Sequence, residues 1–346
     1  MMFDRRGVLG LAGFAIAAAA PLPRRRPERW DAVVDAKGGA GTVPTLGAAL
    51  DLAERAGGRP FRILVEPGTY REKLHVRRSN VTIEGRGPES VLVFGAAAGL
   101  VSPDGSKWGT GRSATLTVEA ADVTLRNLTI RNDFDYLAAR AAPGAFGAQA
   151  VALSLAREAD RIRVDNCRME SWQDTLYVQT RALFTGCTIS GVVDFIFGGG
   201  ASFFDRCIIV TRRVPGATEQ GYVAAPSTPK DQRYGLVFSG CRLQREPGVP
   251  DNSTWLGRPW RAGGNMDLTG EAAFLRCWMD AHIHHEGWTS MGYAGRDGVR
   301  HMLAPHEARL VEFGSMGPGA GPAGPERRLL TGEEAASFTM HNVLGG

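Results

Sequence analysis

Two aspartates, Asp174 and Asp194, lie twenty residues apart, and the same step separates Cys187 from Cys207. If one turn of the fold takes twenty residues, the two carboxyl groups face each other across one strand spacing, about 4.8 Å. Two acids that close cannot both ionise freely, so one is driven toward the protonated form and the other toward the carboxylate. The spacing therefore predicts a nucleophile beside a general acid and base.

A short strand-like pattern recurs along the chain and can supply such turns. Each copy has a small or polar residue, a residue of buried type, any residue, and then an aliphatic one. The copies are Asn80–Ile83, Asn127–Ile130, Asn166–Met169, Gly186–Ile189, Arg206–Ile209, Gly240–Leu243 and Arg276–Met279. The step between the third, fourth and fifth copies is twenty residues, and elsewhere it is 34 to 47. Short alternating segments without amphipathic helices between them predict an all-β solenoid, a β-helix; the alternative is chance similarity among the strands of a sandwich.

The composition fits one large ordered domain. The chain has 346 residues, of which 43% are hydrophobic and 22% charged, and this is ample material for a core. The 45 glycines suit a chain that must bend several times in each turn. After the N-terminal segment, no apolar run is long enough to span a membrane.

The N-terminal segment resembles an export signal. Arg5 and Arg6 precede an apolar run from Gly7 to Ala20, which is too short to span a bilayer. The pair resembles a twin-arginine signal, although the flanking residues do not fit the ideal pattern. We therefore divide the chain into an export signal with a basic leader, residues 1–29, and a β-helix domain, residues 30–346. The domain is expected in the periplasm or outside the cell.

The leader also explains the basic character of the chain. It holds six arginines against two acidic residues, a net charge of +4, which equals the formal charge of the whole chain. The domain that follows is therefore close to neutral. Net charge gives no reason to expect a nucleic-acid partner.

Export would place the five cysteines in an oxidising compartment. Cys187 and Cys207, one turn apart, are within bridging range, and we predict a disulfide between them; a ladder of buried thiols is the alternative. The odd number leaves at least one thiol free or paired elsewhere. The chain has no Cys-x-x-Cys motif, so no metal site is expected.

Five short stretches carry a resemblance to pectin methylesterases. They have the family's order and intervals, and they are Gly68–Glu72, Gln149–Leu153, Gln173–Tyr177, Asp194–Gly198 and Leu256–Trp260. The resemblance runs from about Trp30 to the end of the chain. It implies a right-handed, single-stranded parallel β-helix that hydrolyses the methyl esters of homogalacturonan without a metal or organic cofactor. We expect a monomer.

The residues in these stretches can be given roles in ester hydrolysis. Asp194 is the expected nucleophile, because Arg258, its partner by the resemblance, would keep it anionic. Asp174 is then the general acid for the departing methoxide and the general base for the hydrolytic water. The resemblance gives Gln173 and Gln149 as hydrogen-bond donors to the oxyanion.

Four aromatic residues resemble the family's cleft aromatics, on which sugar rings stack. They are Tyr177, Phe197, Trp260 and Trp288. The alternative for each is a place in the core, above all for Phe197.

Two other classes stay open at this point. A β-helix can be a pectate lyase, which would need a calcium-binding acidic cluster, or a polygalacturonase with a different set of aspartates. It can also be a silent carbohydrate-binding protein or an esterase for another substrate. Two departures from the family lie outside the inferred catalytic set. His285 replaces a usual proline, and the stretch from Arg327 to Leu330 lacks an expected tryptophan.

Overall fold

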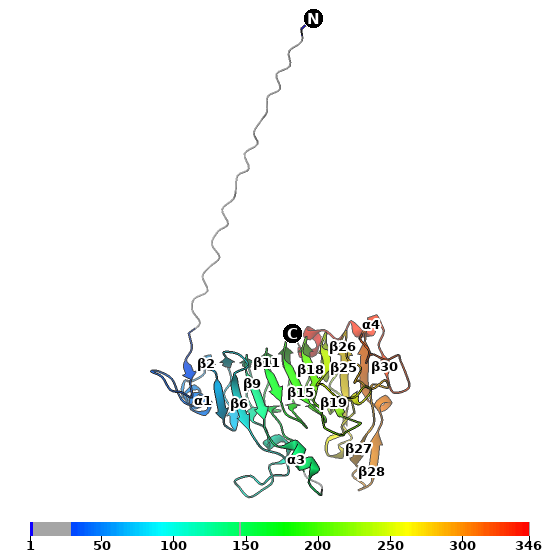
Figure 1. Ribbon diagram of the computed structural model, residues 1–346, viewed down its shortest axis with the longest axis horizontal. Coiled ribbons are helices and arrows are strands. Elements are labelled where there is room, and N and C mark those ends of the chain that lie inside the picture. The colour runs from blue at the N-terminus through cyan, green and yellow to red at the C-terminus, as the bar shows by residue number, and fades with distance from the viewer. Residues whose placement is uncertain (3–28, 145–146, 346) are drawn as a thin grey trace.

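Three parallel β-sheets run the length of the molecule, and the chain passes through them in turn on successive coils (Figure 1). The computed structural model describes residues 1–2, 29–144 and 147–345. In the three long sheets the strands of successive coils lie side by side and pair in parallel. The molecule is a right-handed parallel β-helix, the hand that connections between parallel strands adopt. The predicted fold is confirmed.

Each long sheet takes one strand from most coils. The 11-stranded sheet contains β1 (Ala32–Val34), β2 (Phe61–Val65), β5 (Val81–Gly85), β8 (Val123–Arg126), β11 (Ile162–Asp165), β14 (Ala182–Thr185), β17 (Ser202–Asp205), β21 (Leu236–Ser239), β25 (Glu271–Leu275), β29 (Arg309–Phe313) and β30 (Arg328–Leu329). The 8-stranded sheet contains β3 (Gly68–Arg71), β6 (Ser90–Phe94), β9 (Thr129–Asn132), β12 (Arg168–Glu170), β15 (Thr188–Gly191), β18 (Ile208–Thr211), β22 (Arg242–Arg245) and β26 (Trp278–Met279). The 7-stranded sheet contains β4 (Leu74–Val76), β7 (Leu116–Val118), β10 (Leu153–Leu155), β13 (Leu176–Val178), β16 (Ile196–Gly198), β19 (Gly221–Pro226) and β23 (Thr254–Gly257).

The remaining elements lie in the connections and at the ends of the coils. Two small antiparallel pairs are formed by β20 (Thr228–Pro229) with β24 (Leu268–Thr269) and by β27 (Met291–Ala294) with β28 (Arg300–Leu303). The helices are α1 (Leu46–Arg55), α2 (Gly109–Arg112), α3 (Tyr136–Ala141), α4 (Gly332–Ala335) and α5 (Met340–Leu344), with 3-10 turns η1 (Ala262–Gly264) and η2 (Pro305–Glu307). Figure 1 shows α3 and the β27–β28 hairpin projecting from the same side of the β-helix.

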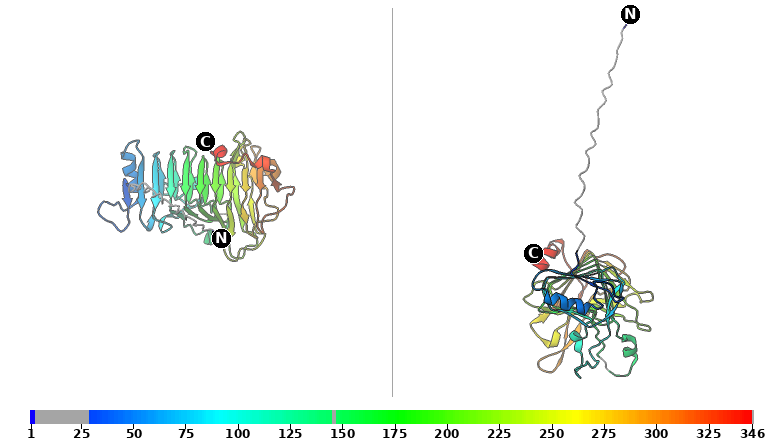
Figure 2. Two further views of the ribbon diagram at one scale, coloured as in Figure 1. Left: turned by 90° about the horizontal axis from the view of Figure 1, so that it is seen from above. Right: turned by 90° about the vertical axis from the view of Figure 1, so that its left-hand side faces the viewer.

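The pairing register confirms a coil of twenty residues in the middle of the chain. Ile196 lies opposite Leu176 in the 7-stranded sheet, and the same offset of twenty recurs between β14 and β17 and between β15 and β18. Figure 2 shows the strands of successive coils stacked side by side. Asp174 and Asp194 both lie two residues before their paired strands, so they occupy equivalent places on neighbouring coils.

Six of the seven predicted strand copies belong to one sheet, and the first does not. The aliphatic residues of the six pair in register through the 8-stranded sheet, from Ile130 to Met279. Asn80–Ile83 instead leads into β5 of the 11-stranded sheet, and Leu92 of β6 takes the expected place beside Ile130. The first copy resembles the others in sequence because it follows the same kind of corner. Asn80 and Asn127 both have positive φ, 60° and 51°, a conformation that asparagine tolerates well.

The predicted disulfide between Cys187 and Cys207 is wrong. All five cysteines are free and buried, and each directly precedes a strand of the 8-stranded sheet. The thiols donate to backbone carbonyls of the coil below, from Cys187 to Val164 at 3.2 Å and from Cys207 to Phe184 at 3.6 Å. The alternative, a ladder of buried thiols, is the one observed.

Aromatic stacking reinforces the interior of the coils. Phe184, Phe204, Phe238 and Phe274 succeed one another on neighbouring strands, with ring centroids 4.5, 4.5 and 4.4 Å apart. All four are fully buried. Burial of each ring contributes about 1.5–3 kcal/mol, and each stacked pair adds about 0.5–1.5 kcal/mol. This column fixes the register of the coils that carry the two aspartates.

The helix α1, which the strand pattern did not predict, lies across the N-terminal end of the β-helix (Figure 2). It buries Leu46 and three further apolar side chains of one face against the first coil. Thr45 caps its N-terminus, and the Glu72 carboxylate accepts hydrogen bonds from the Leu46 and Gly47 amides at 2.8 and 2.9 Å. A carboxylate there also meets the positive end of the helix dipole. Glu72, the last residue of the Gly68–Glu72 stretch, therefore holds the N-terminus of α1 in place.

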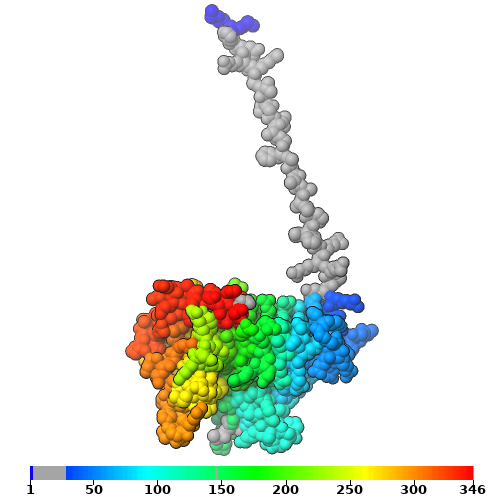
Figure 3. Space-filling model, turned by 180° about the vertical axis from the view of Figure 1, so that it is seen from behind, coloured from blue at the N-terminus to red at the C-terminus, as the bar shows by residue number. Residues whose placement is uncertain are grey.

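The C-terminal segment lies against the outside of the 11-stranded sheet. Val343 of α5 packs with Leu183 and Phe203, whose side chains point out of the coil. Figure 3 shows the C-terminal segment, coloured red, extending from the orange late coils to the green coils in the middle of the chain.

The export signal and the boundary at residue 29 stay predictions, because residues 3–28 lie outside the described part of the chain. No helix among the described residues has the length and apolar character needed to cross a membrane.

Candidate active site

A cavity of about 210 Å³ lies on the outer face of the 7-stranded sheet. Its lining includes both predicted catalytic aspartates, both predicted glutamines and three of the four predicted aromatics. The lining residues are Thr110, Gly111, Gln149, Gln173, Asp174, Tyr177, Asp194, Phe197, Ala225, Trp260 and Met291. Residues more than 180 positions apart in sequence thus meet at one place.

Both aspartates sit in a tight left-handed turn immediately before a strand. Their φ values are 64° for Asp174 and 50° for Asp194. The Asp174 amide donates to the Val193 carbonyl at 3.0 Å, which ties the two turns together. Aspartate is among the few non-glycine residues that adopt this conformation readily, so the residue type serves the turn as well as the chemistry.

The two carboxyl groups have different electrostatic surroundings. Arg258 donates from Nε and from a terminal nitrogen to the two oxygens of Asp194, at 2.9 and 2.7 Å. Within the described residues, no hydrogen bond reaches the Asp174 carboxyl group. Asp174 and Asp194 are 8% and 7% exposed, so each would lose much of its hydration if ionised.

These surroundings separate the pKa values of the pair. Burial raises the pKa of Asp174 well above its usual range, and the neighbouring charge of Asp194 raises it further. Burial also raises the pKa of Asp194, but two hydrogen bonds and the charge of Arg258 oppose that effect. Because only Asp194 has a bidentate cationic partner, the shared proton belongs on Asp174 and the charge on Asp194.

The two glutamines come from adjacent coils. The Gln173 carbonyl accepts from the Ala150 amide at 3.0 Å, which aligns the turn after Gln149 with the turn that carries Asp174. Both side chains line the cavity. Neither side-chain amide hydrogen-bonds another described residue, so both are available to an oxygen placed between them.

Three of the predicted aromatics form a continuous wall. Tyr177 stacks on Phe197 with ring centroids 4.3 Å apart, and Trp260 lies 5.9 Å from Phe197. Phe197 is only 2% exposed, so it forms the base of the wall, whereas Tyr177 and Trp260 are partly open to the solvent. Such a surface can receive the apolar face of a sugar ring.

The prediction of Trp288 as a cleft aromatic is wrong. Trp288 is 1% exposed, lies 5.7 Å from Phe274 of the internal aromatic column, and does not line the cavity. It forms a bridge with Gly257 at the point where the later coils close. The indole belongs to the main hydrophobic core inside the coils.

Several residues of the site were missed. The Tyr222 ring lies 3.8 Å from the guanidinium carbon of Arg258 and supports it from one side. Thr110 and Gly111 reach the cavity from α2, and Met291 reaches it from the β27–β28 hairpin. Thr110, Gly111 and Met291 come from insertions between the strands of the long sheets, where the twenty-residue step gives no information on position. Only Tyr222, directly before the buried part of β19, carried a usable strand signal.

No three His, Cys, Asp or Glu side chains among the described residues are grouped as ligands of one metal ion. The chemistry that the cavity can carry out with its own groups is nucleophilic attack by a carboxylate, assisted by a neighbouring acid and by two amide donors.

Comparisons with known proteins agree with this geometry. The family model described as Pectinesterase matches residues 31–344. Pectinesterase A of Dickeya chrysanthemi is 37% identical, with 98% of this chain and 96% of that protein covered. Among solved structures, pectin methylesterase PemA from Erwinia chrysanthemi superposes with a TM-score of 0.87 at 38% identity, covering 92% of this chain and 98% of that one. A pectin methylesterase in complex with hexasaccharide VII gives a TM-score of 0.86 at 38% identity, with the same coverage.

Proposed function

The chain belongs to the pectinesterase family, and we propose that it removes methyl esters from homogalacturonan through a covalent intermediate on Asp194. The reaction converts pectin and water into pectate and methanol. The similarity to a pectin methylesterase determined with a hexasaccharide supports a polysaccharide substrate.

In the first step, the Asp194 carboxylate attacks the carbonyl carbon of the methyl ester. The negative charge that develops on the carbonyl oxygen is stabilised by the amides of Gln149 and Gln173. The intermediate then collapses, the bond to the methoxy oxygen breaks, and Asp174 donates its proton so that methanol leaves. The product is an acyl-enzyme, a mixed anhydride of Asp194 and the galacturonate carboxyl group.

In the second step, Asp174 acts as a base. Now ionised, it takes a proton from water, and the resulting hydroxide attacks the acyl carbon of the anhydride. Asp194 leaves as a carboxylate, the galacturonate keeps the new oxygen, and Asp174 is protonated again. One residue thus serves as acid and then as base, which requires that its pKa be well above that of an ordinary aspartate.

The observation that carries this proposal is the asymmetry of the two aspartates. Arg258 contacts both oxygens of Asp194 at 2.9 and 2.7 Å, whereas Asp174 is equally buried and has no such partner. The reverse assignment would make the arginine stabilise the charge on the acid and leave the nucleophile protonated.

Methanol release from methylated pectin, without added metal, tests the proposal. We expect Asp194→Asn to lower kcat by at least about 10³-fold, because the nucleophile is removed. Asp174→Asn is expected to lower kcat by about 10²- to 10⁴-fold, since an amide cannot protonate methoxide as an acid does. Asp231→Asn, at an exposed position, is the matched control. Near wild-type turnover by the Asp194 variant would refute the nucleophile assignment.

We propose in addition that the enzyme is exported as a monomer through the signal in residues 1–29, by the twin-arginine route. The arginine pair followed by an apolar run supports export. Cell fractionation with N-terminal sequencing of the mature protein tests the signal, and replacing Arg5 and Arg6 with lysine tests the route. Size-exclusion chromatography with light scattering tests the oligomeric state.

A further inference from the structure

The β27–β28 hairpin reaches the active site from outside the three long sheets. Met291, the first residue of β27, lines the active-site cavity. In the described part of the chain, β27 and β28 form strand pairs only with each other. A two-stranded hairpin is marginally stable by itself. The position of Met291 therefore depends on the contacts that hold the hairpin against the β-helix.

Arg261 joins the hairpin to the loop that follows the aromatic wall. It directly follows Trp260 and is 8% exposed. Its Nη1 donates to the Tyr293 hydroxyl group at 2.8 Å, and its guanidinium carbon lies 4.8 Å from the centroid of the Tyr293 ring. Its Nε donates to the Leu268 carbonyl at 3.1 Å. One buried side chain thus connects the hairpin with the β20–β24 pair.

The contact between Arg261 and Tyr293 is the principal polar attachment of the hairpin. Within the described residues, the only other hydrogen bond from residues 291–303 to the rest of the chain is from the Tyr293 hydroxyl to the Met266 sulfur, at 3.9 Å. Sulfur is a weak acceptor, whereas a hydrogen bond from a charged donor is strong. The hairpin is therefore held at one side chain, Tyr293, by one arginine.

Tyr293 and Met291 lie two residues apart on β27, so their side chains point to the same face of the hairpin. Their partners across the strand pair are His301 and Leu303. The Tyr293 and His301 rings stack with centroids 5.5 Å apart, and Leu303 is fully buried. This face is thus turned toward the β-helix. Holding Tyr293 against Arg261 also turns Met291 toward the cavity.

The backbone that follows Arg261 supports the hairpin as well. Gly264 ends the turn η1, and its amide donates to the Arg261 carbonyl at 3.1 Å. Its φ is 66°, and a Cβ atom at this position would clash with the Ala294 carbonyl oxygen. The turn and the last residue of β27 therefore lie in direct backbone contact, and only glycine fits between them.

We propose that Arg261 is a positioning residue for substrate binding. By holding Tyr293 it keeps the β27–β28 hairpin against the active-site cavity, with Met291 as part of the cavity wall. This inference rests on the proposed function, since it assumes that the polymer binds in that cavity.

The groups that carry out the chemistry do not depend on the hairpin. Both catalytic aspartates lie in turns of the coils. The amides of Arg258 and Trp260 donate to the Ala224 and Pro226 carbonyls of the preceding coil at 3.0 and 2.9 Å. The loop is therefore fixed up to Trp260 without the Arg261 side chain. Loss of that side chain should affect binding of the polymer and leave the chemical steps unchanged.

Steady-state kinetics of methanol release from methylated pectin tests the role of Arg261. For Arg261→Ala we expect KM to rise by about three- to tenfold, because the hairpin is in place for a smaller fraction of the time. We expect kcat to stay within about twofold of the wild type. Tyr293→Phe should raise KM in the same way, since it leaves an Arg261 donor without its acceptor. Arg261→Lys keeps a charged donor and should recover part of the loss.

A double-mutant cycle shows whether Arg261 acts through Met291. If it does, Arg261→Ala in a Met291→Ala background should change KM by less than about twofold. The matched control is Arg296→Ala, which removes the same charge from an exposed place at the tip of the hairpin and should leave KM unchanged. An undiminished effect in the Met291→Ala background, an equal KM rise in the control, or a fall in kcat with unchanged KM would overturn the inference.

Hydrogen exchange with mass spectrometry separates this inference from the proposed function, because it needs no turnover. We expect residues 291–303 to exchange about threefold faster or more in Arg261→Ala, and the strands of the three long sheets to be unchanged. If the wild type releases no methanol but this exchange is faster, the esterase function fails and the hold of Arg261 on the hairpin stands. If methanol is released and both exchange and KM are unchanged, the positioning role fails alone. Faster exchange with unchanged KM would also overturn it.

Discussion

At the residue scale, a single guanidinium group sets the difference between two otherwise similar acids. Asp174 and Asp194 share the turn type, the burial and the place on the coil, and only Asp194 contacts Arg258. The Tyr222 ring holds that guanidinium from the other side. Neutralising one arginine should therefore disturb the protonation of both aspartates rather than the fold around them.

The pH dependence of the reaction tests this directly. The proposed mechanism requires Asp194 ionised and Asp174 protonated, so kcat/KM should fall as pH drops through the pKa of Asp194 and as pH rises through that of Asp174. Since burial raises both pKa values, both limbs should lie above the pH at which an ordinary aspartate titrates. The two apparent values belong to the pair, because the sites interact.

Replacing Arg258 with glutamine should move the acidic limb. Without the cation, the pKa of Asp194 rises, so the acidic limb is expected to shift upward by about one to three pH units and the maximal rate to fall. The pH profile of kcat/KM for methanol release measures this. A lower rate with an unmoved acidic limb would mean that Arg258 acts only by positioning. Arg168→Gln, at an exposed position on β12 of the 8-stranded sheet, provides the charge-matched control.

The grouping of the candidate site residues could be predicted from sequence, because repeat spacing pointed to the two aspartates and the short family stretches contained these and the other three. Asp174, Asp194, Gln149, Gln173 and Arg258 all come together in the structure. Trp288 was misplaced because sequence proximity to a motif does not show whether a side chain faces into or out of a coil. The contact of Tyr222 with Arg258 joins two different coils, and no local pattern encodes such a contact.

At the element scale, a buried ion pair stabilises the C-terminal end of the β-helix. Glu312 lies on β29, and its partner Arg327 directly precedes β30. Arg327 and Glu312 are 1% and 2% exposed in their side chains and form two hydrogen bonds of 2.8 and 2.9 Å. Arg327 also donates to the carbonyls of His284 and His285. This buried arginine lies in the stretch that lacks the family's tryptophan, so a polar network fixes the end of the β-helix here.

Breaking this pair should destabilise the protein strongly. Arg327→Met leaves the Glu312 carboxylate buried without its partner, and we expect a loss of about 3–5 kcal/mol in the free energy of unfolding. Arg327→Met combined with Glu312→Leu should recover much of that loss, because no buried charge remains. Urea unfolding followed by tryptophan fluorescence provides the measurement.

The neighbouring Arg328 offers a matched control. It pairs with Glu334 on the surface, where the side chains are 62% and 43% exposed, so Arg328→Met should cost less than about 1 kcal/mol. If Arg327→Met and Arg328→Met lower the free energy of unfolding by similar amounts, the buried pair stabilises the protein no more than the surface pair does.

The strands themselves were predictable from sequence, and the corners between them were not fully so. Alternation of buried and exposed residues marked the 8-stranded sheet through six copies, and the first of the seven copies, Asn80–Ile83, proved to belong to the 11-stranded sheet. Asn80 and Asn127 turn different corners with the same left-handed geometry, so the local sequence is alike although the sheet that follows differs. The helix α1 was missed because it occurs once, outside the repeat.

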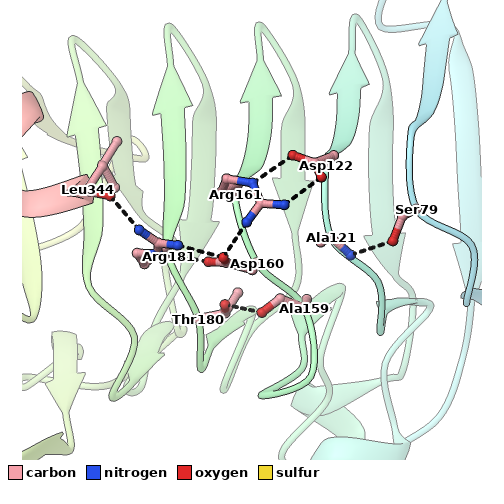
Figure 4. Close-up of polar contacts among 9 residues, drawn as sticks. All are labelled: Ser79, Ala121, Asp122, Ala159, Asp160, Arg161, Thr180, Arg181 and Leu344. Carbon is pink, nitrogen blue, oxygen red and sulfur yellow. Dashed lines mark hydrogen bonds and ion pairs between the residues drawn. The ribbon is translucent and has the colours of Figure 1, made fainter. Parts of the chain in front are cut away.

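At the scale of the whole molecule, the C-terminal helix α5 is fastened to coils in the middle of the chain. Arg181 donates to the Leu344 carbonyl at 3.0 Å and forms an ion pair with Asp160, which also binds Arg161 (Figure 4). Arg161 continues the chain of contacts to Asp122 on the preceding coil. The charged chain therefore links the end of the polypeptide to three successive coils.

Removing Arg181 should loosen this end without unfolding the β-helix. We expect Arg181→Ala to cost about 1 kcal/mol at most in global stability, because the pairs are partly exposed. It should clearly increase hydrogen exchange in residues 340–345, whose last carbonyl groups lose a cationic partner. Hydrogen exchange with mass spectrometry measures both residues 340–345 and the strands of the β-helix.

Arg163→Ala is the control for this variant, since Arg163 is exposed on the same face and forms no hydrogen bond or ion pair with a described residue. Unchanged exchange in residues 340–345 of Arg181→Ala would show that apolar packing of Val343 suffices to hold the helix.

The place of α1 matters for how copies of the molecule can meet. No earlier coil covers the side chains and the unpaired backbone groups at the start of a parallel β-helix. An uncovered strand edge of this kind can pair with a strand of another chain. The apolar face of α1 occupies that end, and Asp51 and Glu54 lie exposed on the helix. A second copy therefore meets a charged helix instead of an open strand. One amphipathic helix of ten residues thus protects this end against filamentous polymerisation.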